Sequence, residues 1–254
     1  KIVVVRLTME NLLNYAHLRR DIDFSVCPFN EVDMLVCADL SYVDWDGIVD
    51  KEEVSLEKAC RKYLSLYSAE ELKSKYTFSM NLPHLIDALQ DTIRYGSIKL
   101  KNYKKIYSDE DVIQFSVVTL VLPDGSLVLS FSGTDGSITG WKENLMMTYK
   151  SNLPCQKLAK DYVKETIENI PETSYLFGLK KKKVYPKIYL TGHSKGGNLA
   201  MYAFLKNPEL QRYIEGVKSF DGPGFVDGFW QGDEDVSKIT NYIPKDSIVG
   251  RVLH

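Results

Sequence analysis

A serine flanked by glycines is the residue of this sequence best placed to do chemistry. Gly192 and Gly196 stand two positions before and after Ser194, between a β-prone apolar run (residues 184–190) and a helix-compatible run (residues 198–205). In a strand–turn–helix setting such a serine occupies a tight, strained bend that projects its hydroxyl above the sheet. The pattern therefore predicts that Ser194 is a catalytic nucleophile in an elbow formed with Gly192 and Gly196. The alternative is a glycine-rich connection without chemistry.

A second turn is placed to assist the same reaction. Acyl transfer requires two backbone N–H groups aimed at the developing oxyanion. One comes from the residue after the nucleophile, here Lys195, and the other from a loop after a neighbouring strand. The predicted strand 127–131 leads into Gly133 and Thr134. We therefore expect Thr134 to complete an oxyanion hole with its N–H and also with its hydroxyl. The alternative is an ordinary turn.

Two aspartates compete for the role of the acid that orients the catalytic base. In this arrangement the chain order is serine, acid, histidine. Asp246 follows the predicted strand 239–243 at its carboxyl end, where sites in open α/β sheets gather, and is favoured. Asp221 ends the preceding predicted strand and remains the rival. Its other role would be to fix the glycine-rich loop 222–224 through backbone bonds.

The catalytic base is the part that the sequence does not supply clearly. A serine hydroxyl is a poor nucleophile near neutral pH without an imidazole to accept its proton. His17 and His84 precede Ser194, and His193 adjoins it at a sharp turn, so we expect structural roles for these three. His254 has the right order but follows Asp246 by too few residues for another strand and loop. It is the candidate base of this chain, and we expect the usual base to lie beyond residue 254, with the C-terminal strand and helix of the domain absent.

Patterning predicts helices and strands that alternate around these motifs. Asn30 is expected to cap a helix, and Ser68 with Glu71 has the pattern of a capping box. The lysine run 180–183 indicates a solvated turn, and residues 60–110 a possible cap over the site. The order after residue 185 predicts a parallel sheet with helices on its faces. Further helices are expected over residues 83–95, 154–170 and 198–206, and strands over residues 114–122, 127–131, 184–190, 214–220 and 239–243.

Composition is that of an ordinary globular protein and excludes several classes. The 254 residues are 44% hydrophobic and 26% charged with a net charge of −2, which offers no basic footprint for nucleic acid. The longest apolar runs are shorter than the roughly 20 residues of a transmembrane helix. Four scattered cysteines favour a reducing, cytoplasmic location, and neither a metal nor a cofactor is expected. Residues 1–8 are interpreted as a tag or an upstream extension, and residues 9–254 as one domain. The oligomeric state is not predicted.

Six ordered motifs resemble the lipase class 3-like α/β-hydrolases, most closely an uncharacterised bacterial branch known as a domain of unknown function. The resemblance implies an α/β-hydrolase fold with a mostly parallel central sheet, helices on both faces and a helical N-terminal or cap region. It also implies Ser194 as nucleophile, Asp246 as acid, and Thr134 and Lys195 as oxyanion donors. Ser132 departs from the pattern, since relatives resemble Phe-Arg-Gly-Thr there. The motifs span residues 25–33, 40–44, 133–143, 192–200, 220–225 and 244–250.

Two function classes follow from these observations. The first is a serine hydrolase that cleaves small-molecule carboxylic esters or acyl groups, as a lipase or esterase does, through an acyl-enzyme on Ser194. The second is a non-catalytic α/β-hydrolase-fold module that binds a ligand or a protein. Transfer of the acyl group to an acceptor other than water would use the same residues as the first.

Overall fold

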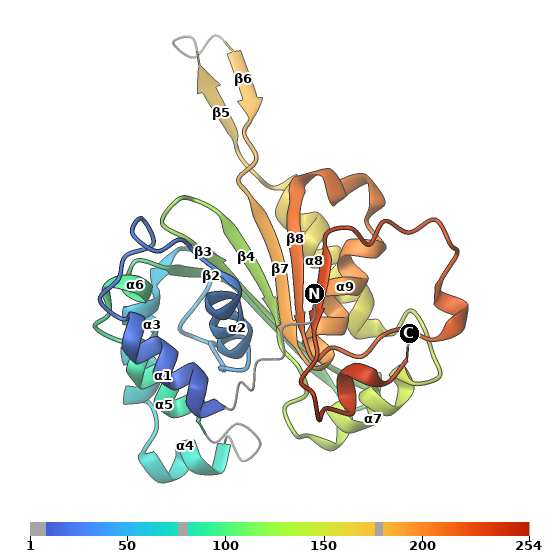
Figure 1. The fold of residues 1–254 in the computed structure, drawn as a ribbon, viewed down its shortest axis with the longest axis horizontal. Helices are drawn as coiled ribbons and strands as arrows, with labels where there is room; N and C mark the ends of the chain where they lie inside the picture. The colour runs from blue at the N-terminus through green and yellow to red at the C-terminus, as the bar shows by residue number, and fades with distance from the viewer. Residues whose placement is uncertain (1–8, 76–80, 176–179, 254) are drawn as a thin grey trace.

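The protein was analysed as a computed structural model that describes residues 9–75, 81–175 and 180–253. In this part of the chain a seven-stranded sheet has the order β1-β2-β3-β4-β7-β8-β9 (Figure 1). Neighbours from β1 to β4 pair antiparallel, and those from β4 to β9 pair in parallel, so β2, β4, β7, β8 and β9 all run in one direction. The strands are Val54–Ser55, Lys99–Ser108, Ile113–Val121, Leu127–Phe131, Ile188–His193, Ile214–Phe220 and Ile239–Tyr242.

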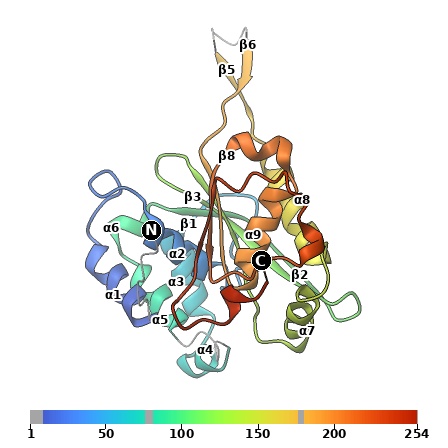
Figure 2. The ribbon, with the colours of Figure 1, turned by 45° about the vertical axis from the view of Figure 1, so that its right-hand side comes forward.

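Helices cover both faces of this sheet, as the fold prediction required. Among the described residues, six lie in the N-terminal half: α1 Met9–Arg19, α2 Glu31–Leu40, α3 Leu56–Ser65, α4 Ala69–Lys75, α5 Leu82–Leu89 and α6 Ile93–Gly96. Three more follow β4 and β7: α7 Ile138–Met147, α8 Pro154–Glu168 and α9 Lys195–Leu205. In Figures 1 and 2 the α1–α6 group and the α8–α9 pair lie on opposite sides of the sheet.

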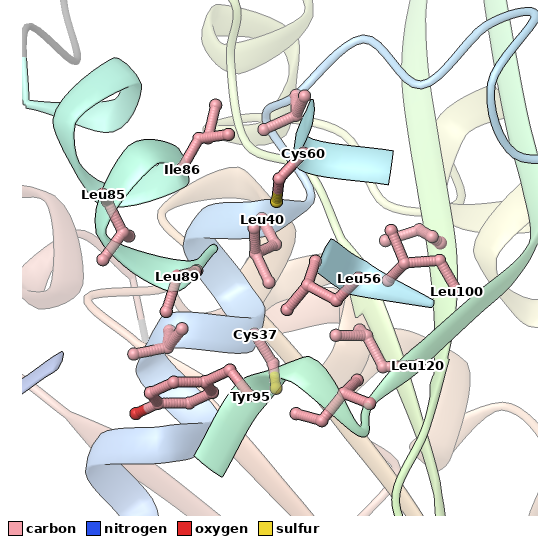
Figure 3. Close-up of a cluster of buried hydrophobic side chains, with 14 of the residues drawn as sticks. Cys37, Leu40, Leu56, Cys60, Leu85, Ile86, Leu89, Tyr95, Leu100 and Leu120 are labelled. Atoms are coloured by element: carbon pink, nitrogen blue, oxygen red, sulfur yellow. The ribbon is translucent and has the colours of Figure 1, made fainter. Parts of the chain in front are cut away.

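Each face of the sheet has its own hydrophobic core. Successive residues of a strand point to opposite faces, so Val117 and Val118 of β3 contribute to different clusters. On one side, α2, α3 and α5 pack with Leu100 and Leu120 of the sheet (Figure 3). On the other side, α8 and α9 pack against Leu129 of β4 and its neighbours. The central strands are therefore buried on both faces, which agrees with their nearly unbroken apolar sequences.

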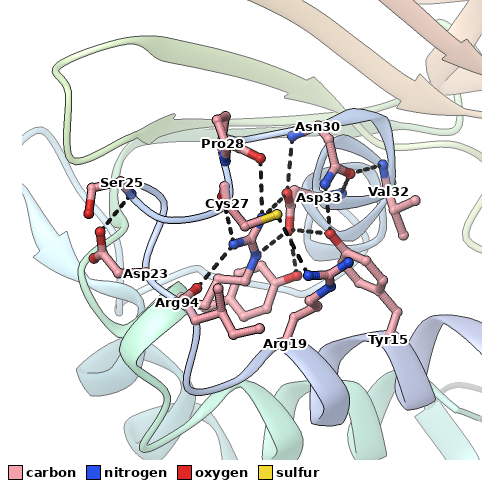
Figure 4. A network of polar contacts seen from close by, with 12 residues as sticks. Tyr15, Arg19, Asp23, Ser25, Cys27, Pro28, Asn30, Val32, Asp33 and Arg94 are labelled. Atoms are coloured by element: carbon pink, nitrogen blue, oxygen red, sulfur yellow. Dashed lines mark hydrogen bonds and ion pairs between the residues drawn. The ribbon is translucent and has the colours of Figure 1, made fainter.

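The N-terminus of α2 is fixed by a buried polar network (Figure 4). The predicted cap is confirmed, because Asn30 Oδ1 accepts from Val32 N at 2.8 Å and the Asp33 carboxylate accepts from Asn30 N at 3.1 Å. Asp33 also pairs with Arg94 of α6, with Nε to Oδ1 at 2.8 Å, and both side chains are fully buried. This network anchors α2 against α6, and Ser130 of β4 donates to a carbonyl of α2 at 2.8 Å. The residues that follow Leu40 therefore start from a fixed position relative to the sheet.

Several sequence predictions are confirmed closely. Strands β3, β4, β8 and β9 occupy the predicted stretches within one residue. The turn between β3 and β4 closes as expected, with Asp124 accepting from Ser126 N at 2.9 Å and Gly125 at φ +83°. Ser68 and Glu71 form the predicted reciprocal cap at the start of α4, with bonds of 2.7 and 3.3 Å. The four cysteines are free thiols.

Other predictions are wrong, and the lysine run is the clearest case. Lys180–Lys183 is not a turn but strand β6, paired with β5 (Glu172–Tyr175) in a two-stranded hairpin that stands away from the body (Figure 1). Backbone pairing with β5, and not an apolar pattern, makes this stretch a strand. The strand expected over residues 184–190 begins only at Ile188 and ends at His193.

The segment 60–110 differs from the expected cap in one respect. It includes β2, an integral strand of the sheet. The sequence analysis did not predict this strand, because only Leu100 of its ten residues is buried and no alternating apolar pattern results. The single helix expected over residues 83–95 is divided into α5 and α6 at Asp91, which adopts φ +50°. The helical N-terminal region itself is present. Movement of part of it as a lid stays a prediction.

Two boundary predictions are not addressed by the fold. Residues 1–8 lie outside the described residues, and the single-domain boundary 9–254 stays a prediction. No helix within the described ranges has both the length and the apolar character required to span a bilayer.

Candidate active site

Ser194 occupies a strained bend between a strand and a helix. It follows β7 directly, precedes α9 directly, and has φ +54° and ψ −126°, a combination that non-glycine residues rarely adopt. Its N–H donates to Phe220 O of β8 at 2.8 Å, and its carbonyl accepts from Gly197 N at 2.9 Å. The side chain is partly exposed, and its hydroxyl bonds to no other residue in the described ranges. The geometry is that expected of an elbow at the carboxyl end of the parallel strands.

The glycines beside the serine are required by close backbone contacts. A Cβ at Gly192 would collide with the backbone of Gly196, and a Cβ at Gly196 would collide with the carbonyl of Phe131 in β4. An ideal Cβ at Gly197 would lie 3.0 Å from Gly222 Cα, in the loop after β8. The start of α9 therefore packs closely against the ends of β4 and β8. This packing restricts the backbone dihedral angles that Ser194 can adopt.

Thr134 lies in the loop that borders the elbow. An ideal Cβ at the preceding residue, Gly133, would come within 2.7 Å of His193 O, so the loop runs directly beside the nucleophile turn. The Thr134 N–H and the Lys195 N–H donate to no other residue in the described ranges. The Thr134 hydroxyl was expected to face the oxyanion, but it donates to Asn144 Oδ1 at 2.9 Å. The backbone groups remain available as donors, whereas the hydroxyl is already used.

The side chain of Lys195 forms a buried ion pair that the sequence analysis did not anticipate. Its Nζ lies 2.5 Å from Glu143 Oε2 of α7, and the two side chains are 1% and 0% exposed. The same Nζ donates to both the carbonyl and the side-chain oxygen of Gln114, each at 2.6 Å. The available signal was a lysine at the start of an otherwise apolar helix. Its partner lies 52 residues away in the sequence and could not be inferred from spacing.

The described histidines do not serve Ser194. His193 Nδ1 lies 2.9 Å from the hydroxyl of Tyr42, the second residue after α2. Burial lowers the pKa of the His193 imidazole while the Asp221 charge opposes that shift, so His193 is neutral near pH 7. His17 and His84 are exposed on α1 and α5. These placements agree with the structural roles expected of all three. His254, the candidate base, lies outside the described residues.

The two candidate acids occupy different environments. Asp246 is exposed and forms no hydrogen bond with the rest of the described chain. Asp221 directly follows β8 with φ +57°, accepts from Ser247 Oγ at 2.6 Å and accepts from Gly250 N at 3.0 Å. Asp221 therefore fixes the loop after β9, not the glycine-rich loop that follows it in sequence. The choice between the two acids stays a prediction.

A hollow of about 240 Å³ opens beside the Thr134 loop, over the ends of β2 and β3. Its wall is polar and aromatic. Asp44 in this wall forms ion pairs with two lysines: its Oδ2 lies 2.9 Å from Lys105 Nζ and 3.8 Å from Lys75 Nζ. The side chains and backbone that line it belong to Tyr42, Asp44, Lys75, Tyr103, Lys105, Ile106, Tyr107, Gln114, Phe115, Ser116, Ser132, Thr134 and Asp135. Groups that could hold a metal ion do not cluster anywhere in the described ranges.

A mostly parallel sheet with helices on both faces, and with a strained serine between a central strand and the next helix, defines an α/β-hydrolase fold. The family is shown by the sequence itself. The chain belongs to the Mbeg1-like family, whose model matches residues 89–254 and so includes the elbow, the Thr134 loop and both aspartates. No curated protein sequence matches the chain. A bacterial source stays a prediction.

Solved structures similar to the chain include three lipases. A lipase from Rhizopus microsporus var. chinensis is 14% identical with a TM-score of 0.48, over 100% of this chain and 73% of that one. M37 lipase is 18% identical with a TM-score of 0.39, over 84% and 67%. A fungal lipase in an inhibitor complex is 14% identical with a TM-score of 0.41, over 72% and 74%. Similarity at this level carries no argument about activity or substrate.

Crowding at the elbow predicts a large cost for one added methyl group. Gly196→Ala should lower the free energy of unfolding by about 1–3 kcal/mol, because its Cβ must displace the Phe131 carbonyl. Gly228→Ala is the matched control, since an added Cβ there meets nothing within 4 Å and should change stability by less than about 0.5 kcal/mol. Urea denaturation of the two variants measures the difference. Equal stability of both would contradict the close contact described above.

Proposed function

We propose that this protein is a serine hydrolase that cleaves carboxylic esters or acyl groups through an acyl-enzyme on Ser194. The observation that carries the proposal is the strained Ser194 bend, with a hydroxyl that bonds to no described residue, beside the unengaged N–H groups of Lys195 and Thr134. Strain of this kind costs about 1–3 kcal/mol and persists where the surrounding structure holds it in place for a function.

The proposed reaction begins with attack by Ser194 Oγ on the carbonyl carbon of the substrate. The new C–O bond moves the carbonyl electrons onto oxygen, and the Lys195 and Thr134 N–H groups stabilise that negative charge. The proton of Ser194 passes to a base and then to the departing alcohol. Water next attacks the acyl-enzyme and releases the acid, which restores the serine. A different acceptor in the second step would make the protein an acyltransferase.

Asp246 is proposed as the acid, with Asp221 as the alternative, and His254 remains the candidate base. A non-catalytic binding module is the second candidate function. One observation favours it, because His17, His84 and His193 leave the Ser194 hydroxyl without an imidazole among the described residues. Removal of a triad base reduces catalysis by on the order of 10⁴- to 10⁶-fold. The two functions therefore differ sharply in the expected reactivity of one serine.

Covalent labelling with a fluorophosphonate distinguishes the two functions. We expect the probe to phosphonylate Ser194 Oγ with release of fluoride, so the native protein should be labelled and Ser194→Ala should not. Ser65→Ala, which removes an exposed serine of α3, should be labelled like the native protein. Intact-mass spectrometry followed by peptide mapping provides the readout. A folded full-length form that takes up no label would support the binding module instead.

The different surroundings of the two aspartates predict different effects of their substitution on stability and on the reactivity of Ser194. Asp246→Asn should leave stability within about 0.5 kcal/mol, because the side chain is exposed, yet lower reactivity by on the order of 10⁴-fold. Asp221→Asn should weaken the fold by about 1–3 kcal/mol, because Ser247 and Gly250 lose a charged acceptor. Labelling rates and urea unfolding are measured on both. If Asp246→Asn is labelled as fast as the native protein, and folded Asp221→Asn is labelled much more slowly, Asp221 and not Asp246 is the acid.

A further inference from the structure

Two consecutive residues of α7 each hold one of the two oxyanion donors. Glu143 binds the Lys195 side chain, with Oε2 to Nζ at 2.5 Å. Asn144 binds the Thr134 side chain, with Oδ1 to Oγ1 at 2.9 Å. Lys195 and Thr134 are the residues whose backbone N–H groups the proposed function uses. The same helix therefore contacts both halves of the proposed oxyanion hole through side chains that the reaction itself does not need.

The Lys195–Glu143 pair is not explained by stability. Both side chains are buried, and desolvation of two charges often costs more than their attraction returns. The ammonium group is nevertheless fully satisfied, because its remaining donors reach the two oxygens of Gln114 in β3 at 2.6 Å. The lysine is thus fixed at its far end by α7 and β3, and at its near end by the elbow. A residue held at both ends has a backbone N–H with a defined direction.

The position of α7 is itself precisely set. The helix follows the Thr134 loop within three residues, and Ser137 caps it by accepting from Gly140 N at 3.0 Å. Gly140 allows the close approach, because an ideal Cβ there would lie 2.8 Å from Thr134 Cγ2 and 3.2 Å from Gln114 Oε1. In Figure 1, α7 lies at the end of the sheet opposite the β5–β6 hairpin, which is where β4 and β7 end. The helix is therefore well placed to set the distance between the two donor groups.

We propose that Glu143 and Asn144 are positioning residues that clamp the Lys195 and Thr134 N–H groups into one oxyanion hole. This inference rests on the proposed function. Neither residue touches the reacting atoms in this account. Glu143 acts through the Lys195 side chain, and Asn144 acts through the Thr134 hydroxyl. Their loss should affect the stabilisation of the transition state more than the binding of the substrate.

The test removes the clamp without leaving a charge unpaired. In the double variant Glu143→Leu/Lys195→Met both charges are replaced by apolar groups of similar size. The protein should stay folded with a lowered urea midpoint, because Gln114 O and Oε1 lose their donor. The fluorophosphonate labelling rate of Ser194 should nevertheless fall by about 10- to 100-fold, since the loss of one oxyanion donor costs about 10²- to 10³-fold. Lys142→Met, an exposed neighbour on α7, is the control and should react like the native protein.

A second variant keeps the test independent of the buried pair. Asn144→Leu breaks only the Thr134 contact at a partly buried position, and it should also slow labelling by at least about tenfold at an unchanged urea midpoint. With a p-nitrophenyl ester, kcat should fall in both variants while KM changes little. Native labelling with equally fast variants would overturn the clamp and leave the serine hydrolase intact. Absence of labelling in a folded full-length form would overturn both.

Discussion

The backbone at Ser194 is the constraint on which the rest of the structure depends. Three elements converge there, because the register pairs Phe131 of β4 with Gly192 and Phe220 of β8 with His193. The first turn of α9 then presses against the ends of both neighbouring strands, at distances that only glycine permits. A serine in this bend cannot relax to an ordinary φ without separating the helix from the sheet. The sheet therefore stabilises a conformation that would otherwise be unfavourable.

The same convergence determines which groups surround the hydroxyl. Strand β4 leads into the Thr134 loop, and α7 follows that loop closely enough to hold both Thr134 and Lys195 through side-chain contacts. From the opposite face of the sheet, α2 is anchored by the Asp33–Arg94 pair and delivers Tyr42 to the residue before the nucleophile. Two buried ion pairs, Asp33–Arg94 and Lys195–Glu143, thus lie behind the parts that meet at the elbow.

Local patterns in the sequence were sufficient for much of the fold and for the strained bend at Ser194 in the candidate site. Ser194, Gly192 and Gly196 form a short motif whose conformation depends mainly on its own residues, and the β3–β4 turn is likewise local. Strand β2 was missed because pairing with β3, not burial of its own side chains, makes it a strand. The lysines of β6 misled for a related reason, since pairing with β5, in a hairpin that stands away from the body, makes them a strand. Contacts between distant residues, such as Lys195 with Glu143 and Asp221 with Gly250, have no local signature.

The central claim is that the Lys195 and Thr134 N–H groups face a charge that develops on a group attached to Ser194. The most direct measurement is a crystal structure of the protein after reaction with a fluorophosphonate. The account predicts phosphonate bound to Ser194 Oγ, with its phosphoryl oxygen about 2.7–3.1 Å from both nitrogen atoms. A phosphoryl oxygen directed away from these two groups, or phosphonate attached to another residue, would contradict it.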